Sequence, residues 1–299
     1  MDILKELKYI KQIYDRGENV IKFLKNQKAE TANSIEAIMV SYDFQAGTYI
    51  EDLKVRSDFI NQYSDYLAKV IKKLGKSFSL LEAGVGEATT LGNVLGKLKN
   101  SFKKVYGFDI SWSRVKKGQW YLNFLGIKDF NLFSGNLFEI PLQDNSMDIV
   151  YTSHSIEPNG GCEKEIMEEL YRVTNKYLIL LEPAYELANE EQRQRMRENG
   201  YITSLYASAK ELGYKILEWR LFDVCVNPLN PTGILLIEKN GKATNACKDP
   251  FVCPITKTAI RKIKGAYFSE SSFLVYPIID NVPCLLSRLA VIATHYLDE

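Results

Sequence analysis

The feature that most constrains the fold is a change of rhythm near residue 78. From there to about residue 239, short apolar runs alternate with helical segments, which is the pattern of βαβ units and a parallel sheet. A short turn with two prolines separates the last two runs and leaves no room for a helix, so we expect an antiparallel hairpin. The pattern predicts an α/β fold with strands near 78–83, 104–109, 129–134, 147–153, 176–181, 214–222 and 233–239, and helices near 87–99, 112–125, 162–173 and 200–212.

Helical spacing dominates the chain before this region. Residues 1–75 carry apolar side chains at intervals of three and four, with charges between them, and are predicted to form a helical N-terminal region. A glycine and several aromatic side chains interrupt the spacing at 41–50, which predicts a folded-over loop. Tyr42 and Tyr49 in this loop either cover a binding cleft as a lid or staple the helices onto the main domain.

A small unit is expected at the end of the chain. We place the main domain at 76–242, where a polar linker follows the last predicted strand. Strand-like runs broken by prolines then fill 248–299. This segment predicts a small β-rich domain that leans on the larger one.

Charge and cysteine content indicate which classes of function the sequence does not favour. The 38 Lys and Arg against 37 Asp and Glu give a formal net charge of +1, so no overall field favours a nucleic acid. The N-terminus lacks the pattern of a signal peptide, and no apolar run is long enough to span a membrane, so we expect a cytoplasmic protein. Five cysteines without a CxxC pair predict free thiols, and only two histidines predict no transition-metal site.

A glycine-containing turn follows the first predicted strand. Glu82 ends the apolar run, and Gly84 and Gly86 remove the side chains that would keep a ligand from the backbone. The same glycines also suit a purely structural turn. Thr89 stands where a dinucleotide-binding fingerprint has its third glycine, which argues against an NAD site.

Polar side chains also follow the next two strands. In an open α/β sheet, ligands bind beyond the carboxyl ends of the strands, so these side chains are expected to converge. Asp109 can accept both hydroxyl hydrogens of a ribose, or it can cap the next helix, a task that Ser111 also suits. Ile110 can pack against an adenine ring. Asn136 can pair with an adenine edge or form a turn.

Three segments together, 81–86, 107–111 and 140–150, resemble the motifs of class I S-adenosylmethionine-dependent methyltransferases, especially the ubiquinone- and menaquinone-biosynthesis-like branch. The resemblance spans about residues 76–240 and implies a Rossmann-like sheet with S-adenosylmethionine as the cofactor. It implies that the methionine half contacts Gly84, Gly86 and Glu82, that the ribose and adenine contact Asp109, Ile110, Asn136 and Leu137, and that Ser153 also lies at the cofactor. The family often has Asp at the Asn136 position, so this adenine contact departs from the usual pattern.

The loop after the fourth strand lies, by the same resemblance, where the transferable methyl group emerges. His154 titrates in the useful range and Glu157 follows on the same loop, so each is a candidate catalytic base for a protonated nucleophile. The alternatives are that His154 contacts the cofactor or packs, and that Glu157 fixes the loop.

Residues after the fifth strand face the same cleft. Glu182 and Tyr185 follow this strand, and Tyr185 joins Tyr42 and Tyr49 as a candidate substrate-binding residue. The next polar run carries three arginines that either meet an anionic acceptor or form a solvated helix face, namely Arg193, Arg195 and Arg197.

The C-terminal unit resembles the small zinc-ribbon-type protein that activates several RNA and translation-factor methyltransferases. The segments 253–256 and 276–286 carry this resemblance. A zinc ribbon needs two pairs of closely spaced ligands, but Thr256 replaces the second ligand of the first pair and 269–273 supplies no cysteine. We expect a degenerate ribbon without metal that activates or stabilises the enzyme in cis.

The sequence thus predicts an enzyme that transfers a methyl group from S-adenosylmethionine to an O or N atom of a small-molecule or saccharide-type acceptor. The activator-like tail supports a second hypothesis, with RNA or a translation protein as substrate. The chain lacks the Asn-Pro-Pro-Tyr-type motif of amide and nucleobase N-methylation after the fourth strand, which weighs against that hypothesis. A third hypothesis is a methyltransferase-like scaffold without catalysis.

Overall fold

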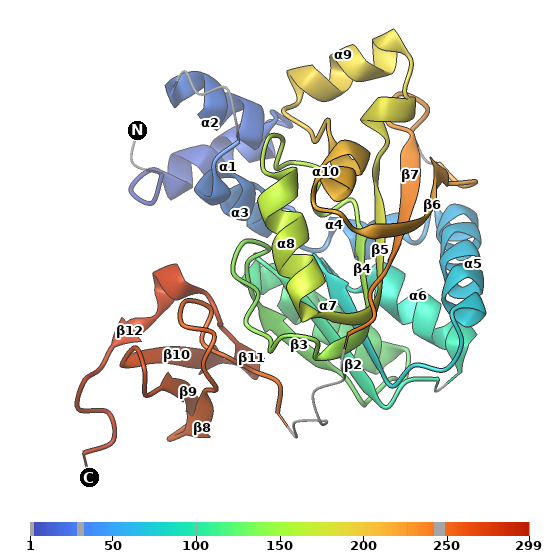
Figure 1. Ribbon diagram of the computed structural model, residues 1–299. Coiled ribbons are helices and arrows are strands. Elements are labelled where there is room, and N and C mark those ends of the chain that lie inside the picture. Colours follow the sequence, from blue (N-terminus) through green and yellow to red (C-terminus); the bar gives the residue numbers. More distant parts are fainter. Residues whose placement is uncertain (1–2, 29–32, 100, 226, 242–248, 299) are drawn as a thin grey trace.

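A seven-stranded mixed sheet forms the centre of the computed structural model, which describes residues 3–28, 33–99, 101–225, 227–241 and 249–298 (Figure 1). The strand order is β3-β2-β1-β4-β5-β7-β6. Only β7 runs antiparallel to its neighbours β5 and β6, which confirms the predicted α/β fold with a reversed last strand. The strands are β1 Ser79–Ala83, β2 Lys104–Asp109, β3 Asn131–Ser134, β4 Met147–Ser153, β5 Thr174–Pro183, β6 Lys215–Leu221 and β7 Thr232–Glu238.

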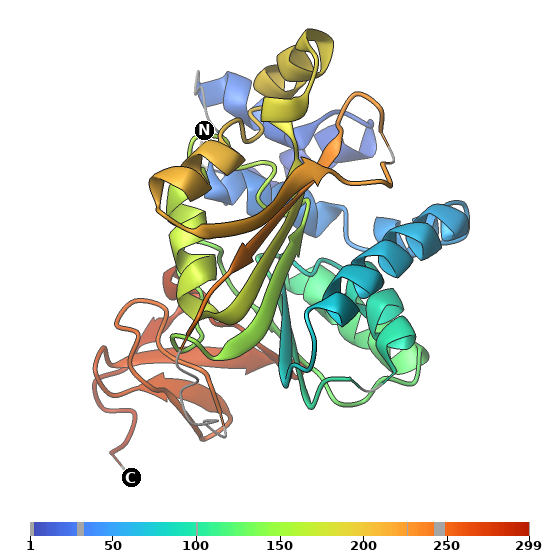
Figure 2. The ribbon, with the colours of Figure 1, turned by 45° about the vertical axis from the view of Figure 1, so that its right-hand side comes forward.

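Two helical layers cover the two faces of this sheet (Figure 2). Leu80 packs in the core on one face and Leu81 in the core on the other, as the two-residue period of a strand requires. The Leu80 face is covered by α5 (Ser57–Lys73), α6 (Thr89–Leu98) and α7 (Trp112–Phe124), and the Leu81 face by α8 (Glu163–Val173) and α10 (Leu205–Glu211). Between β5 and α10 lie η1 (Tyr185–Leu187) and α9 (Glu190–Glu198).

The N-terminal region is helical, as its apolar spacing predicts. It contains α1 (Leu7–Asp15), α2 (Val20–Lys28), α3 (Ile35–Phe44) and α4 (Thr48–Asp52). The prediction of a loop over 41–50 is wrong for most of that stretch, because α3 continues to Phe44 and α4 begins at Thr48. Only the turn around Gly47 is irregular, and this glycine has the left-handed φ of 109° that stops one helix before the next.

A second, antiparallel sheet lies near the C-terminus, beside β3 and α7 (Figure 1). Its strands are β8 Arg261–Ile263, β9 Ala266–Ser269, β10 Leu274–Ile279, β11 Val282–Pro283 and β12 Val291–Ile292, with η2 at Ser287–Leu289. The Leu285 N–H donates to the Ser134 carbonyl over 2.9 Å, and Phe251 packs edge-on against Phe133 in the core of the main sheet. The small sheet therefore covers the β3 edge of the large one.

None of the described helices is both long enough and apolar enough to cross a membrane. The four cysteines within the described ranges are free thiols, and Cys247 lies outside those ranges. No group of three or more metal-ligating side chains occurs in the same ranges.

Candidate functional site

A cavity of about 480 Å³ opens at the carboxyl ends of β1, β2 and β4. Ligands bind at this position in open α/β sheets, where the strand order reverses between β1 and β4. Almost all of the residues predicted to form the site line it, namely Tyr42, Tyr49, Glu82, Gly84, Gly86, Asp109, Ile110, Asn136, Leu137, Ser153, His154 and Glu157. The exception is Tyr185, which is not part of the lining.

Gly84 and Gly86 both have the left-handed backbone expected of the turn after β1, with φ of 76° and 51°. A Cβ atom at Gly84 would lie 2.0 Å from the Cβ of Ser155. The Ser155 hydroxyl donates to the Ala83 carbonyl over 2.7 Å, so the loop after β4 packs directly on this turn. Gly84 is thus needed mainly so that the turn after β1 and the loop after β4 can pack together. Gly86 leaves its backbone exposed to the cavity.

Asp109 ends β2 and is buried at the floor of the cavity. Its Oδ2 atom accepts the Gly86 N–H over 3.0 Å and its Oδ1 atom accepts the Ser111 N–H over 2.9 Å. Ser111, and not Asp109, caps α7, because its side chain accepts the Arg114 N–H. Each carboxylate oxygen keeps a lone pair for a further donor. Burial raises the pKa of Asp109, while the Arg114 guanidinium opposes this rise.

Glu82 lies behind the same turn and is 2% exposed. The Tyr151 hydroxyl donates to its Oε2 atom over 2.8 Å. Burial raises the pKa of Glu82 to about 8. An ammonium group placed beside this carboxyl would favour its ionised form and lower the pKa again.

Asn136 and Leu137 line the cavity just beyond β3. The Asn136 Oδ1 atom accepts the Phe138 N–H over 3.3 Å, so this residue forms the turn that the sequence left as an alternative to adenine binding. Asn136 can form the turn and still contact a ligand, because the turn uses its Oδ1 atom and leaves the amide nitrogen free to donate to a ligand.

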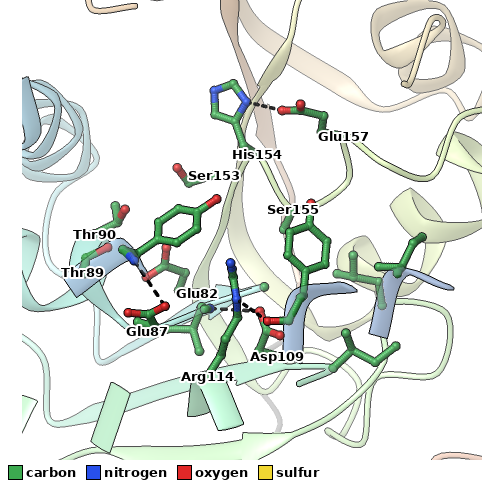
Figure 3. Close-up of a pocket in the computed structure, with 18 of the residues that line it drawn as sticks. Glu82, Glu87, Thr89, Thr90, Asp109, Arg114, Ser153, His154, Ser155 and Glu157 are labelled. Atoms are coloured by element: carbon green, nitrogen blue, oxygen red, sulfur yellow. Dashed lines mark hydrogen bonds and ion pairs between the residues drawn. The ribbon is translucent and has the colours of Figure 1, made fainter. Parts of the chain in front are cut away.

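His154 and Glu157 form a hydrogen-bonded pair in the loop after β4 (Figure 3). The His154 Nδ1 atom lies 2.6 Å from Glu157 Oε2, and its Nε2 atom lies 2.8 Å from Thr232 Oγ1 at the start of β7. Burial alone would lower the pKa of His154, but the Glu157 carboxylate outweighs it and the pKa is raised. His154 has a φ of 54°, a strained value for a non-glycine residue that often marks a functional position.

Glu182 fixes the backbone of this loop from the end of β5. Its carboxylate accepts N–H groups of Ser155, Ile156 and Glu157 over 3.0 to 3.2 Å. Burial raises the pKa of Glu182 to about 7. The loop that carries His154 is therefore held by a buried side chain rather than left free.

Arg114 lies between the two tyrosines that were expected to form a lid. Its guanidinium carbon lies 4.7 Å from the ring centre of Tyr42 and 4.4 Å from that of Tyr49. Its Nε atom donates to the Tyr42 carbonyl over 3.0 Å. Arg114 gave no sequence signal, since an arginine in an amphipathic helix ordinarily points to solvent.

Two carboxylates also join the helical region to the turns of the cavity. Glu87, next to Gly86, accepts the N–H groups of Gly47 and Ile50 over 2.9 Å each. Asp43 accepts the hydroxyl groups of Ser111 and Ser113 at the start of α7. The segment that covers the cavity is therefore fastened to the loops that form its floor.

Tyr185 lies outside the cavity, contrary to its expected role in acceptor binding. Its hydroxyl accepts a hydrogen bond from Arg197 over 2.7 Å, and its carbonyl accepts one from Arg193. Of the three arginines of this run, only Arg195 lines the cavity. Arg195 points in a different direction from α9 than Arg193 and Arg197 do, and the polar run in the sequence does not show which of them faces the cavity.

Comparisons with known proteins point to a methyltransferase domain. Residues 81–180, about a third of the 299 residues, match the family model described as a methyltransferase domain. A search of curated proteins finds no match. The magnesium protoporphyrin IX methyltransferase of Synechocystis PCC 6803, solved with bound S-adenosylhomocysteine, is similar in fold, with 15% identity, a TM-score of 0.50, and 66% of this chain and 97% of that chain covered.

Two further solved structures show a weaker likeness. A methyltransferase from Aquifex aeolicus has 20% identity and a TM-score of 0.44, with 57% of this chain and 87% of that chain covered. One from Methanosarcina mazei has 16% identity and a TM-score of 0.48, with 58% and 98% covered. Residues 81–180 thus match a methyltransferase domain, and the chain has the fold of a methyltransferase that was solved with S-adenosylhomocysteine, which supports an enzyme that uses S-adenosylmethionine.

Proposed function

We propose that the protein transfers the methyl group of S-adenosylmethionine to an O or N atom of a small-molecule or saccharide-type acceptor. The observation that carries this proposal is the shared cavity, into which both the expected cofactor residues and the His154–Glu157 pair face. Its volume of about 480 Å³ falls within the roughly 300 to 1,000 Å³ typical of small-molecule sites.

The cofactor is proposed to lie along the carboxyl ends of β1 and β2. The carboxylate of Asp109 would accept the ribose hydroxyls, since each of its oxygens keeps a lone pair after binding backbone. Glu82 would face the amino group of the methionine half. The remaining contacts are proposed for Gly84, Gly86, Ile110, Asn136, Leu137 and Ser153.

The protein would mainly align the reacting groups and move one proton. Methyl transfer is an in-line displacement at a sulfonium, which the cofactor supplies, so positioning the acceptor contributes much of the rate. In neutral His154, Nδ1 donates its proton to Glu157, and Nε2 accepts a hydrogen bond from the Thr232 hydroxyl. Rotation of the Thr232 side chain about its Cα–Cβ bond would move Oγ1 away from Nε2, which could then take the acceptor's proton.

A small acceptor fits the cover of the cavity. Tyr42 and Tyr49 line the cavity from α3 and α4, and Phe59 and Ile60 line it from α5. These side chains would shield the transfer from water and surround an acceptor of limited size. The resemblance of the domain to the ubiquinone- and menaquinone-biosynthesis-like branch belongs to the same proposal.

The C-terminal unit is proposed to stabilise the cofactor site in cis, as a degenerate relative of the zinc-ribbon-type activator protein. The Leu285 N–H binds the carbonyl of Ser134, two residues before Asn136. The Trp112 indole donates to the Ile279 carbonyl over 3.3 Å, which ties the start of α7 to the same unit. These contacts support a structural role beside the adenine end of the cavity.

Titration calorimetry with S-adenosylmethionine and S-adenosylhomocysteine tests the proposal. We expect both to bind the wild type, and Asp109→Ala to weaken each by at least about tenfold, because two charge-assisted ribose contacts are lost. Asp65→Ala is the matched control, since this exposed carboxylate on α5 pairs with Lys97 away from the cavity. Absence of heat with either ligand, or unchanged binding by Asp109→Ala, would overturn the proposed site.

A further inference from the structure

We propose that the methyl acceptor carries a carboxylate group that binds Arg195, and that its nucleophilic O–H or N–H group lies at Asn230 beside the His154–Glu157 pair. This inference rests on the proposed methyl transfer and names the acceptor class. Both side chains line the cavity. Each also has a buried polar atom without a hydrogen-bond partner among the described residues, Arg195 Nη1 and Asn230 Oδ1.

Arg195 has a donor left over after its contacts within the protein. Its guanidinium carbon lies 5.7 Å from the ring centre of Tyr201, and the Tyr201 hydroxyl interacts with both Arg195 and Glu157. These contacts orient the guanidinium but leave Nη1 unsatisfied. A buried charged donor without a partner is costly, and an anionic oxygen of a ligand would satisfy it.

The other two arginines of the cavity are already engaged. Arg114 donates to the Tyr42 carbonyl and to Gln45 Oε1 and lies between two tyrosine rings. Arg56 pairs with Asp52 over 3.7 Å. Within the described ranges, Arg195 is therefore the cavity cation best placed to meet a ligand's negative charge.

Asn230 presents an unsatisfied acceptor, whereas Arg195 presents an unsatisfied donor. Its Nδ2 atom donates to Glu157 Oε1 over 3.3 Å, and this bond fixes the orientation of the amide because a carboxylate can only accept. The Oδ1 atom is consequently an acceptor without a donor. A hydroxyl or amine of the ligand supplies that donor, at a position where Glu157 and His154 are already paired.

The surroundings favour a carboxylate over a phosphate. One unsatisfied guanidinium nitrogen suits a single negative charge, whereas a phosphate carries about two charges and usually binds several donors. The Tyr201 hydroxyl interacts with both Glu157 and Arg195. The negative charge of Glu157 would repel a phosphate with two charges more strongly than a carboxylate with one. Ile35, Ile38 and Phe59 provide apolar lining, so the structure assigns the body of the acceptor to the apolar class.

Calorimetry on the full-length protein saturated with S-adenosylhomocysteine tests the inference. The probes are apolar hydroxy- and amino-carboxylic acids, such as 3-phenyllactate and 4-hydroxyphenylacetate, each paired with its primary amide, together with inorganic phosphate. We expect at least one acid to bind about tenfold or more tightly than its amide, as a charge-assisted hydrogen bond implies. Arg195→Gln is expected to abolish that difference, and Arg195→Lys to restore part of it.

Arg197→Gln is the matched control on the same helix, because Arg197 pairs with Glu190 and Tyr185 outside the cavity. It should leave the preference for the acid unchanged. Equal binding of every acid and its amide, a preference that persists in Arg195→Gln, or phosphate binding tighter than every acid would overturn the inference. None of these results contradicts the proposed methyl transfer as long as the wild type binds S-adenosylhomocysteine. A wild type that does not bind S-adenosylhomocysteine would instead overturn the proposed function.

Discussion

Glu82 is a buried carboxyl whose charge state depends on what lies beside it. Its pKa of about 8 means that the protein binds a proton there at neutral pH. An ammonium group on the cofactor favours the ionised form, so binding below pH 8 must release that proton. The affinity for S-adenosylhomocysteine should therefore increase with pH, by up to about tenfold per pH unit, and level off above pH 8.

Calorimetry between pH 6 and pH 8.5, in buffers of different ionisation enthalpy, measures both the affinity and the number of protons released. Glu82→Gln removes the titrating group and should remove the slope. A slope of the same size in Glu82→Gln would assign the proton to another group.

The His154–Glu157 pair makes a separate prediction for pH dependence. A base must be neutral to accept a proton, and the pKa of His154 is raised above its ordinary 6.5, so activity should increase with pH at a midpoint above 6.5. Glu157→Gln removes the charge that holds this pKa up, so the midpoint should move to lower pH. His154→Gln should reduce kcat by roughly 100-fold or more.

His295→Gln is the control for this series, because His295 is exposed and pairs with Asp298 near the C-terminus. Its pH profile of kcat/KM should match that of the wild type. A midpoint that does not move in Glu157→Gln would show that the profile reports another group.

The same pair contributes to stability over a defined range of pH. The raised pKa of His154 contributes stability below 6.5 that is lost as the pH rises through its folded pKa. The lowered pKa of Glu157 contributes stability above 4.5 that is lost as the pH falls through its folded pKa. The pair therefore stabilises the loop most between these limits, and it gives up part of that stability at the pH where His154 becomes a base.

Residues adjacent to a strand end could be predicted, and residues brought in from elsewhere could not. Asp109 and His154 follow apolar runs in the sequence, so the sheet alone places them at one edge. Thr232 and Asn230 lie more than seventy residues after His154 and Glu157, and they reach these residues only because β7 pairs with β5. Such partners depend on tertiary pairing and leave no local pattern.

The α3–α4 segment is the element whose attachment can be tested directly. Glu87 is 1% exposed, and its two carboxylate oxygens accept backbone N–H groups at the start of α4. A glutamine has only one accepting oxygen and cannot form both hydrogen bonds. Glu87→Gln should lower the free energy of unfolding by about 1 to 3 kcal/mol and speed hydrogen exchange over residues 35–52. The affinity for S-adenosylhomocysteine should fall as well, because the turn beside Gly86 loses its cover.

Glu51→Gln is the matched control, since Glu51 is an exposed carboxylate on α4 itself. It should change neither exchange nor affinity. Equal protection from hydrogen exchange over residues 35–52 in Glu87→Gln and Glu51→Gln would mean that the contacts of Tyr42 and Tyr49 with Arg114 alone hold α3 and α4 in place.

At the level of elements, the period of the apolar residues predicted the central sheet closely. Each of its seven strands lies within a few residues of its expected place, because buried strands have a strong and simple pattern. The loop predicted over 41–50 is largely helical, because aromatic residues have low helix propensity but pack well here, with Tyr42 against Arg114. Tertiary contact outweighed local propensity at that point.

The large and small sheets share one hydrophobic core, so the molecule should unfold as a unit. Phe251 is 5% exposed and packs against Phe133 at 5.1 Å and Tyr267 at 5.3 Å between ring centres, one ring in each sheet. Removing this ring leaves a cavity that both sheets border. Phe251→Ala should cost about 3 to 5 kcal/mol and lower the temperature of a single calorimetric transition by roughly 6 °C or more.

The half-exposed Phe273 of the same unit provides the matched control, and Phe273→Ala should lower that temperature much less. Phe251→Ala should also weaken S-adenosylhomocysteine binding, because Phe133 immediately precedes the β3 end that leads to Asn136. Two separate transitions, with only the minor one displaced by Phe251→Ala and the affinity unchanged, would show that the small sheet folds independently and gives the cofactor site no support.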